Sequence, residues 1–275
     1  MIEILEPGPL ATVQDLGRPG FAALGVPRSG AFDRAALRLA NRLVGNSDDA
    51  AAIEVTLGGL EIRLTAAATI ALTGAPCPGA PDWGRAVSIP AGASVRLAMP
   101  PSGLRSYLAV RGGVGAAPVL GSRSTDTLSG LGPDPLRRGD VLAIGRGAGE
   151  VSGAGALGSP AGDAILPIRF GPREDWFTAA ARASLVGAAW IVRPESDRVG
   201  IRLDGPRLAR AQDGELPSEP VLPGAVQVPS DGRPILFGPD APVTGGYPVI
   251  AVVTGLDRAA QLRPGDPVRF SSGRG

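Results

Sequence analysis

Glycine and proline interrupt this chain so often that long regular elements have little room. The sequence of 275 residues contains 41 Gly and 28 Pro, which is above the usual share of both. Between them lie short apolar or alternating runs of the kind that form strands bounded by turns. These runs cover residues 61–64, 95–98, 107–110, 141–144, 189–192, 235–237 and 249–253. The pattern predicts a mainly β fold with a few helices, barrel-like rather than built from βαβ units.

Three segments have the apolar spacing of helices. The first lies between Ser29 and Asn46, with Asp33 in its first turn, where a carboxylate suits the helix dipole. The second is predicted from Pro172, at the first helical position, to Gly187. A short third helix is predicted from Asp257 to Leu262.

The distribution of small residues predicts two subdomains. Residues 146–164 are nearly all Gly, Ala, Ser and Pro, which is typical of a linker. They separate a first subdomain, residues 1–145, from a second, residues 165–275. The string Leu-Arg-Arg-Gly-Asp at 136–140 is echoed by Leu-Arg-Pro-Gly-Asp at 262–266, so each subdomain is expected to end in a similar turn and strand.

The missing residue types exclude whole classes of chemistry. The chain has no His, and all 27 of its basic residues are Arg. A Ser-His-Asp triad, a His-ligated metal, a Schiff-base lysine, a P-loop lysine and a biotinyl-lysine are therefore excluded, and no metal site is predicted. A general base has to be Asp, Glu, Tyr or the single Cys77. An electrophilic group has to be Arg or a backbone N–H.

The charge and hydropathy of the chain limit the kinds of partner that it is expected to bind. The formal net charge is +1 with the charges dispersed, which argues against nucleic acid as a partner. No apolar run approaches the length that crosses a bilayer, so no membrane association is expected. The first residues lack the basic and apolar regions of a signal peptide, and Cys77 has no partner for a disulfide. A cytoplasmic location is the simplest interpretation.

Four polar strings are too elaborate for ordinary turns. The first runs through residues 14–20, 25–33 and 40–46, and the second through 105–113 and 120–126. The third covers residues 196–205, and the fourth covers 224–229 and 244–248. Together these strings closely resemble the family of KipA and the 5-oxoprolinase C subunit, also called allophanate hydrolase subunit 2. The same module forms half of the carboxyltransferase domain of urea carboxylase, and the resemblance covers nearly the whole chain.

The resemblance implies two cyclophilin-like β-barrel subdomains, with the active region in a cleft shared with a KipI-like B subunit. It implies a hydrolase that opens the cyclic amide 5-oxo-L-proline to L-glutamate at the expense of ATP, with an A subunit that completes the complex. ATP is expected to be bound by the complex rather than by this chain alone. One alternative is a carboxyltransferase subunit for urea or a similar amide, with biotin supplied by a partner. Another is a KipA-type regulator without turnover that binds a KipI-like kinase inhibitor.

Within the strings, arginine is the residue best suited to hold an anionic substrate, because its planar fork grips carboxylates. Arg18, Arg111, Arg123 and Arg198 are the candidates, and a structural ion pair is the alternative for each of them. Asp15 is the first choice for an essential acid or base, or else it caps a turn. Arg123 and Asp126 complete the predicted catalytic set.

The remaining candidates are substrate-binding residues in loops. The polar loop Ser122-Arg123-Ser124-Thr125-Asp126 follows a glycine and can present hydroxyl and N–H groups to an anion, unless it is only a solvated turn. The string Ser196-Asp197-Arg198 has the same two interpretations. Thr244-Gly245-Gly246-Tyr247 can approach a ligand closely or simply close a hairpin. Gln14 and Gln227 suit amide recognition, or else tie strands together.

Overall fold

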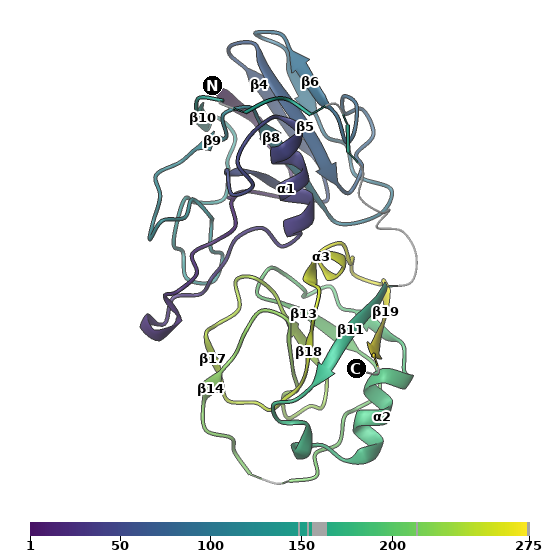
Figure 1. Ribbon diagram of the computed structural model, residues 1–275. Helices are drawn as coiled ribbons and strands as arrows, with labels where there is room; N and C mark the ends of the chain where they lie inside the picture. The colour runs from purple at the N-terminus through teal and green to yellow at the C-terminus, as the bar shows by residue number, and fades with distance from the viewer. Residues whose placement is uncertain (148, 153, 156–163, 213, 274–275) are drawn as a thin grey trace. The chain divides into compact units, whose positions relative to one another are not determined.

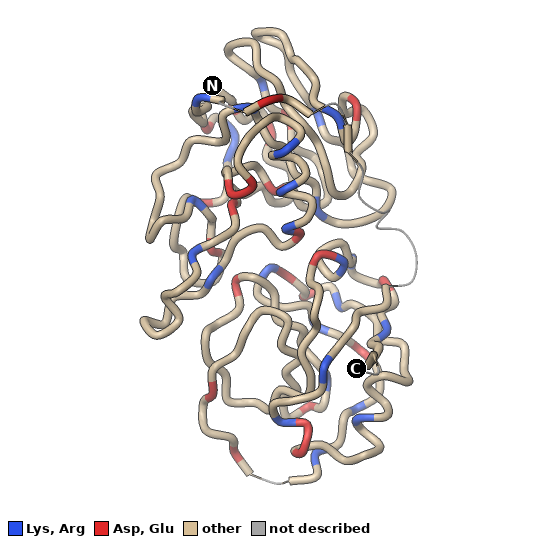
Figure 2. Tube along the Cα trace, viewed as in Figure 1, with Lys and Arg blue, Asp and Glu red and all other residues tan. Residues whose placement is uncertain are grey.

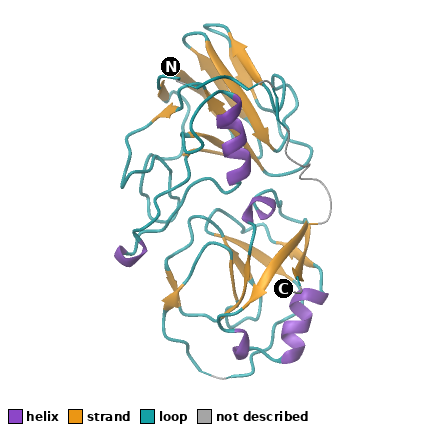
Figure 3. Cartoon of the chain, in the orientation of Figure 1, coloured by secondary structure: helices purple, strands orange, loops and turns teal. Residues whose placement is uncertain are grey.

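A computed structural model describes residues 1–147, 149–152, 154–155, 164–212 and 214–273 of the chain. They divide into two units. Unit 1 consists of Met1–Arg18 and Ser29–Ala161, and unit 2 of Pro19–Arg28 and Gly162–Gly275. Strands and loops predominate in both units and helices are few (Figures 1 and 3). The mainly β fold class predicted from the sequence is therefore confirmed.

Unit 1 contains two five-stranded sheets, in the orders β7-β4-β1-β10-β9 and β2-β3-β8-β5-β6. The strands of unit 1 are β1 Ile2–Pro7, β2 Leu10–Gln14, β3 Ala52–Thr56, β4 Leu60–Leu64, β5 Ala68–Gly74, β6 Ala86–Ile89, β7 Ser94–Arg96, β8 Arg105–Val110, β9 Val114–Gly115 and β10 Val141–Ile144. Their inward side chains meet in one core that draws on both sheets. In β4, for example, Leu60, Ile62 and Leu64 are buried while Arg63 is exposed, as the period of a strand requires.

Helix α1, Arg34–Leu43, covers the outer face of the second sheet. It lies within the predicted range but begins later than predicted, at Arg34, because Asp33 is the N-cap residue rather than part of the first turn. The Asp33 carboxylate accepts the Ala36 N–H at 2.9 Å. The helix packs on strand residues that are mostly alanine, including Ala71 and Ala109. Small side chains on the sheet allow the helix to approach closely.

A buried acid supports the start of α1. Glu54 on β3 accepts the phenol of Tyr107 at 2.6 Å and the backbone N–H of Phe32 at 3.0 Å. The Tyr107 oxygen in turn accepts the Asp33 N–H at 2.8 Å. Arg105 lies 3.6 Å from the Glu54 carboxylate, and its guanidinium stacks 4.3 Å above the Phe32 ring. These contacts fix Phe32 and Asp33, directly before α1, against the sheet.

Unit 2 is a closed barrel in the order β11-β18-β15-β16-β13-β12-β19, with a separate two-stranded β14-β17 sheet. Its strands are β11 Ala164–Phe170, β12 Trp190–Val192, β13 Gly200–Asp204, β14 Glu219–Pro220, β15 Ala225–Gln227, β16 Ile235–Phe237, β17 Thr244–Gly245, β18 Val249–Val253 and β19 Pro267–Ser272. The barrel closes through parallel pairing of β11 with β19. Helix α3 spans Leu256–Ala259, shorter than predicted.

The second helix begins later than the sequence pattern predicts. Helix α2 spans Ala179–Gly187, and residues Glu174–Trp176 form a separate 3-10 turn. Between them the chain is extended, because Phe177 is buried and forms a β-bridge with Arg210. Thr178 then caps α2 by accepting the Ala181 N–H at 3.1 Å. Tertiary pairing therefore overrides the helical pattern that starts at Pro172.

The repeated Arg-x-Gly-Asp strings form the same turn in both units. In unit 1 the Asp140 carboxylate accepts the Arg137 N–H at 2.7 Å, and in unit 2 Asp266 accepts that of Arg263 at 2.8 Å. The glycine of each turn has a φ of +89° or +90°. It donates its N–H at 2.8 Å to a neighbouring strand, β1 or β12. Each turn leads into a strand, β10 or β19, as the duplication predicts.

The predicted linker is structured at its beginning. The N–H groups of Gly149 and Ser152 donate to the carbonyls of Gly45 and Leu43, near the end of α1. Residues 148, 153 and 156–163 of this segment lie outside the described residues. Acidic and basic positions are dispersed along both units (Figure 2). Within the described part of the chain, none of the helices is both long and apolar enough to span a bilayer.

The Tyr107 network predicts an alkaline loss of stability. Burial, followed by the negative charges of Glu54 and Asp33, raises the pKa of Tyr107 well above its ordinary value. Above about pH 10, the ordinary pKa of tyrosine, only the unfolded chain releases this proton, so the free energy of unfolding is expected to fall as pH rises. Denaturant unfolding at pH values of about 9 and about 11, on either side of that pKa, measures the effect. The chain has 2 Tyr, 1 Cys and no Lys, so few other groups titrate in this range.

Tyr107→Phe is expected to remove this alkaline loss and to cost about 1–3 kcal/mol at neutral pH, because Glu54 and the Asp33 N–H each lose a partner. Tyr247, which is 45% exposed, provides the matched control. If Tyr247→Phe removed the alkaline loss and Tyr107→Phe did not, the assignment to the buried network would be wrong.

Candidate functional site

The carboxylate of Asp15 organises the polar loop of unit 1. Asp15 directly follows β2 and is 6% exposed. Its Oδ1 accepts the hydroxyls of Ser122 and Ser124, both at 2.6 Å, and the N–H of Gly17 at 2.7 Å. Its Oδ2 accepts the N–H of Arg123 at 2.6 Å. Hydrogen bonds to a charged acceptor are short and strong, so this one side chain holds two distant segments together.

The loop is held from a second side by Gln14. The Gln14 amide donates to Thr12 Oγ1 at 3.0 Å and to the carbonyl of Thr125 at 2.9 Å. The same carbonyl accepts the hydroxyl of Ser29 at 3.1 Å. Ser29 has a φ of +54°, which is rare for a residue with a side chain. Ser29 and Thr12 were not among the predicted site residues, because the sequence pattern marks Ser29 only as the beginning of a helix.

A buried ion pair completes this cluster. Arg18 Nη1 lies 4.0 Å from Asp126 Oδ2, and both side chains are fully buried. The other Arg18 nitrogens donate to the backbone carbonyls of Ser124 and Val119. Asp126 Oδ1 accepts two backbone N–H groups of its own loop, each at 3.0 Å. Arg18 and Asp126 therefore brace the loop as well as facing each other.

Four polar atoms in this cluster retain unused hydrogen-bonding capacity. Gln14 Oε1, Arg18 Nη1, Thr125 Oγ1 and Asp126 Oδ2 are buried, and none has a hydrogen-bond partner within the described residues. A buried polar atom without a partner costs about 1–3 kcal/mol. Such atoms are few in native proteins, and a group of them indicates strain or a position for a polar molecule. The cluster is therefore the best candidate site in unit 1.

Arg123 differs from the other residues of the loop. Its backbone N–H is bound by Asp15, but its side chain is exposed, and its Nε donates to the carbonyl of Ala116 at 3.0 Å. Among the described residues it forms no ion pair. The remaining nitrogens of the guanidinium are thus available to an anion from solvent.

Arg111 lies apart from this cluster. Its guanidinium donates to the carbonyl of Val44, at the C-terminal end of α1, at 3.2 Å. Asp15 lies near the opposite end of the same helix, where its carbonyl accepts the N–H of Ala31. A side chain at Gly147 would clash with Arg111, so the arginine is packed as well as bonded. Arg111 thus contacts a backbone carbonyl near the end of α1, which is not the ion pair that the sequence left open as the alternative.

The string Ser196-Asp197-Arg198 also makes structural contacts, in unit 2. Arg198 forms a two-pronged bond with Asp240, at 2.8 and 3.0 Å, with both side chains buried. The Asp197 carboxylate accepts two backbone N–H groups of its own turn, and Ser196 Oγ accepts the Arg202 N–H at 3.0 Å. The alternative interpretation, an ion pair beside a turn, fits these contacts.

Gln227 and the loop Thr244–Tyr247 meet in unit 2. Gln227 Nε2 donates to the Tyr247 carbonyl at 2.9 Å, and a Cβ at Gly245 would lie 2.5 Å from that same nitrogen. A side chain at position 245 would therefore require the Gln227 amide to shift. Thr244 and Gly246 are exposed, and the Tyr247 ring has the Arg210 guanidinium 6.0 Å from its centre. Arg210 was not predicted, since its surrounding sequence has no distinctive pattern.

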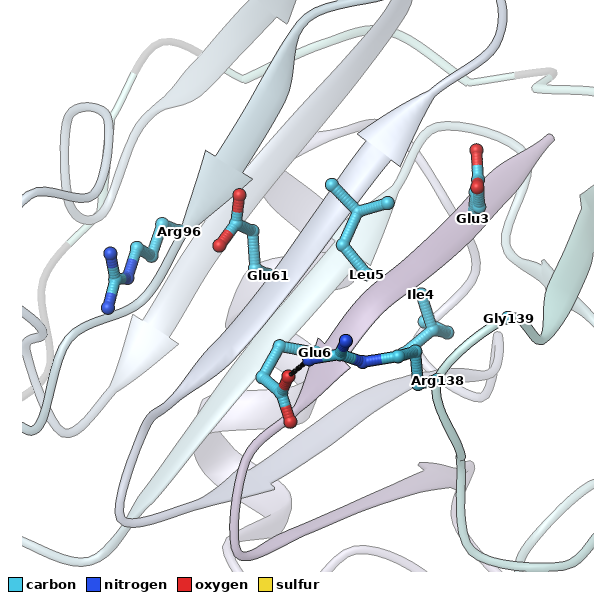
Figure 4. A pocket seen from close by; sticks show the side chains of 8 residues that line it. All are labelled: Glu3, Ile4, Leu5, Glu6, Glu61, Arg96, Arg138 and Gly139. Carbon is cyan, nitrogen blue, oxygen red and sulfur yellow. Dashed lines mark hydrogen bonds and ion pairs between the residues drawn. The ribbon is translucent and has the colours of Figure 1, made fainter.

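A groove of about 500 Å³ opens on the outer face of β1 and β4 (Figure 4). It is lined by Glu3, Ile4, Leu5, Glu6, Glu61, Arg96, Arg138 and Gly139. Glu6 is paired with Arg138, and Glu3 with Arg63 outside the groove. None of the predicted site residues lines it. Exposed ion pairs of this kind are typical of a solvated sheet face and contribute little to stability.

Comparisons with known proteins identify the family of the chain. The family model described as carboxyltransferase domain, subdomain A and B, matches residues 24–272, and the chain belongs to this family. It is 41% identical over 281 residues to the C subunit of 5-oxoprolinase from Escherichia coli (strain K12), covering 98% of this chain and 90% of that protein.

Solved structures show the same fold. The crystal structure of TTHA0988 superposes with a TM-score of 0.90 at 34% identity, covering 98% of this chain and 55% of that one. The Kluyveromyces lactis urea carboxylase gives a TM-score of 0.91 at 29% identity, covering 98% of this chain and 27% of that one. The chain thus spans about half of the first solved chain and about a quarter of the second. In both, further polypeptide accompanies the matching segment.

Asp15→Asn tests the organising role of the carboxylate. The amide keeps one acceptor oxygen but presents an NH₂ group to the Arg123 N–H, so a loss of about 1.5–3 kcal/mol in unfolding free energy is expected. Faster amide hydrogen exchange at Arg123 and Ser124 should accompany it. Asp197→Asn is the control, because that exposed carboxylate also accepts backbone N–H groups. Equal losses in the two variants would contradict the organising role.

Proposed function

We propose that the chain is the C subunit of an ATP-dependent 5-oxoprolinase and that it opens 5-oxo-L-proline to L-glutamate together with the A and B subunits. The observation that carries this proposal is the 41% identity to the C subunit of a 5-oxoprolinase over nearly the full length of both proteins. The urea carboxylase relative is less similar, at 29%. An essential acid–base role for Asp15 and catalytic roles for Arg123 and Asp126 belong to the same proposal.

The chemistry of the substrate suits the unit 1 cluster. 5-Oxoproline carries a carboxylate and a lactam amide, so it needs a cation and neutral amide-binding groups. Arg123 supplies an exposed guanidinium, and its backbone N–H is held by the Asp15 carboxylate. Gln14 and Thr125 supply neutral polar atoms with unused capacity. In this proposal Arg123 binds the carboxylate, and the cluster around Asp15 keeps its position.

The unit 1 cluster does not fit the phosphates of ATP. Its buried cation, Arg18, already faces the carboxylate of Asp126 at 4.0 Å, and the carboxylate of Asp15 lies in the same loop system. Two acids beside one buried arginine disfavour a polyanion. ATP is therefore proposed to be bound by the other proteins of the complex.

The decisive experiment is reconstitution. The chain is co-purified with its A and B partners, and ATP-dependent release of glutamate from 5-oxoproline is measured. The similarity to urea carboxylase favours a second candidate, transfer of a carboxyl group from a partner's carboxybiotin to urea or a related amide. An assembly that ignored 5-oxoproline but carboxylated urea would establish that second function. Association with a KipI-like protein without any turnover would instead indicate a KipA-type regulator.

Arg123→Ala is expected to lower kcat/KM for 5-oxoproline by about 10–100-fold, the value of a lost charge-assisted hydrogen bond. Folding and association with the partner proteins should be unchanged. Arg96→Ala, at an exposed arginine in the groove of Figure 4, is the control and should leave kcat/KM as it is. Loss of activity in the control alone would place the site in the groove instead.

A further inference from the structure

Three side chains of unit 2 meet at Tyr247 without using up one another's binding capacity. Gln227, at the end of β15, donates its Nε2 to the Tyr247 carbonyl at 2.9 Å. Arg210, in the loop after β13, holds its guanidinium 6.0 Å from the centre of the Tyr247 ring. Tyr247 itself, just before β18, is 45% exposed. Three segments that are distant in the sequence therefore bring together an amide, a cation and an aromatic ring.

The Gln227 side chain retains the groups that bind another amide. The residue is 5% exposed, and its Oε1 has no hydrogen-bond partner among the described residues. One Nε2 hydrogen is given to Tyr247, so the second hydrogen and the Oε1 acceptor remain unused. Gly245 leaves room for the amide in this position, since a Cβ there would lie 2.5 Å from Nε2. A carboxamide that is buried but only partly bonded is unusual in a native protein.

Arg210 adds a positive charge with which no acid of the described chain forms an ion pair. Its Nη2 donates to the Val228 carbonyl at 3.2 Å, and its buried Nε has no hydrogen-bond partner among the described residues. Glu219, which lies opposite Gly245 across the β14–β17 pair, is bound instead by Arg173, with Nε 2.9 Å from the carboxylate. The guanidinium of Arg210 is therefore left for an external carboxylate.

We infer that unit 2 carries a binding site for a small ring amide with a carboxylate, formed by Gln227, Arg210 and Tyr247. A ring amide is held in the cis form, so its N–H and C=O lie on one edge, and the free groups of a carboxamide can bond both. The carboxylate binds Arg210, and the ring packs on the exposed face of Tyr247. Residues of unit 2 alone form this site, so it is additional to the Asp15 cluster. Because 5-oxoproline has this composition, the identity of the natural ligand rests on the proposed function.

Binding of three ring compounds to the full chain, measured by ligand-observed NMR titration, tests this site. 5-Oxoproline has both groups, cyclopentanecarboxylate lacks the amide, and 2-pyrrolidinone lacks the acid. Titration of the Arg123→Ala chain, which lacks the exposed guanidinium of unit 1, isolates the site in unit 2. There 5-oxoproline is expected to bind about tenfold more tightly than either of the other compounds, because each of them leaves a polar side chain unpaired.

Two further variants, made in the Arg123→Ala chain, separate recognition from folding. Gln227→Leu should raise the Kd of 5-oxoproline about tenfold and leave that of cyclopentanecarboxylate unchanged, since the latter has no amide to lose. Arg210→Met should likewise weaken 5-oxoproline but not 2-pyrrolidinone, which has no carboxylate. Arg269→Met, at an exposed arginine on β19, is the control and should change none of the three Kd values.

Equal weakening of all three compounds by Gln227→Leu would overturn the assignment of this site. So would absence of 5-oxoproline binding in the Arg123→Ala chain, an outcome that leaves the proposed function intact with its one site in unit 1. If unit 2 bound 5-oxoproline as described but the reconstituted complex released no glutamate from it, the proposed function would fall and the site would stand.

Discussion

One buried carboxylate determines the shape of the candidate site. Asp15 stands at the end of β2, and besides Gly17 the residues that donate to its carboxylate lie more than a hundred positions later, in the loop 122–124. That loop has no strand ladder of its own within the described residues beyond the bridge between Val119 and Ser122. Its conformation therefore depends on side chains. The exposed Arg123 takes its backbone position from this anchor.

Neighbouring parts of unit 1 hold the segment that contacts Asp15 and its loop. The network of Glu54 and Tyr107 fixes the segment before α1, and that segment contributes Ser29 and Ala31 to the site. The same segment contains Gly30, whose Cβ would collide with the backbone at Gly17. The segment is thus held by the Glu54 and Tyr107 network on one side and by the Asp15 cluster on the other. Such networks restrict motion when they are satisfied, and the unused atoms around Arg18 and Asp126 show where this one is incomplete.

Much of the fold could be predicted from the sequence, because apolar period and turn residues are local signals. The seven expected strand runs and the two Arg-x-Gly-Asp turns were found in this way, although strands such as β1, β5 and β11 lie outside those runs. Helix α1 was found as well, but it begins later than expected. The start of α2 was not, since Pro172 and the acidic residues after it look helical locally. The pairing of Phe177 with Arg210 is non-local, and it keeps the chain extended until α2 begins.

The candidate site likewise has features that local sequence signals reveal and features that depend on distant residues. Sequence strings identified Gln14, Asp15 and the loop 122–126, and the structure brings them together. The strings could not distinguish Arg123, whose side chain is exposed, from Arg198, whose guanidinium is paired with Asp240. The distinction depends on what lies opposite each guanidinium, and that partner is 42 residues away for Arg198.

The parallel closure of the unit 2 barrel has a consequence for synthesis of the chain. Strand β19 fills the gap between β11 and β12, and it emerges from the ribosome after every other strand of the barrel. Until it arrives, two strand edges with free backbone groups remain open, one of them on β11, the first strand of the barrel to be made. Open edges pair readily with other chains. A nascent chain of this kind therefore depends on rapid completion, or on protection of β11 while it waits.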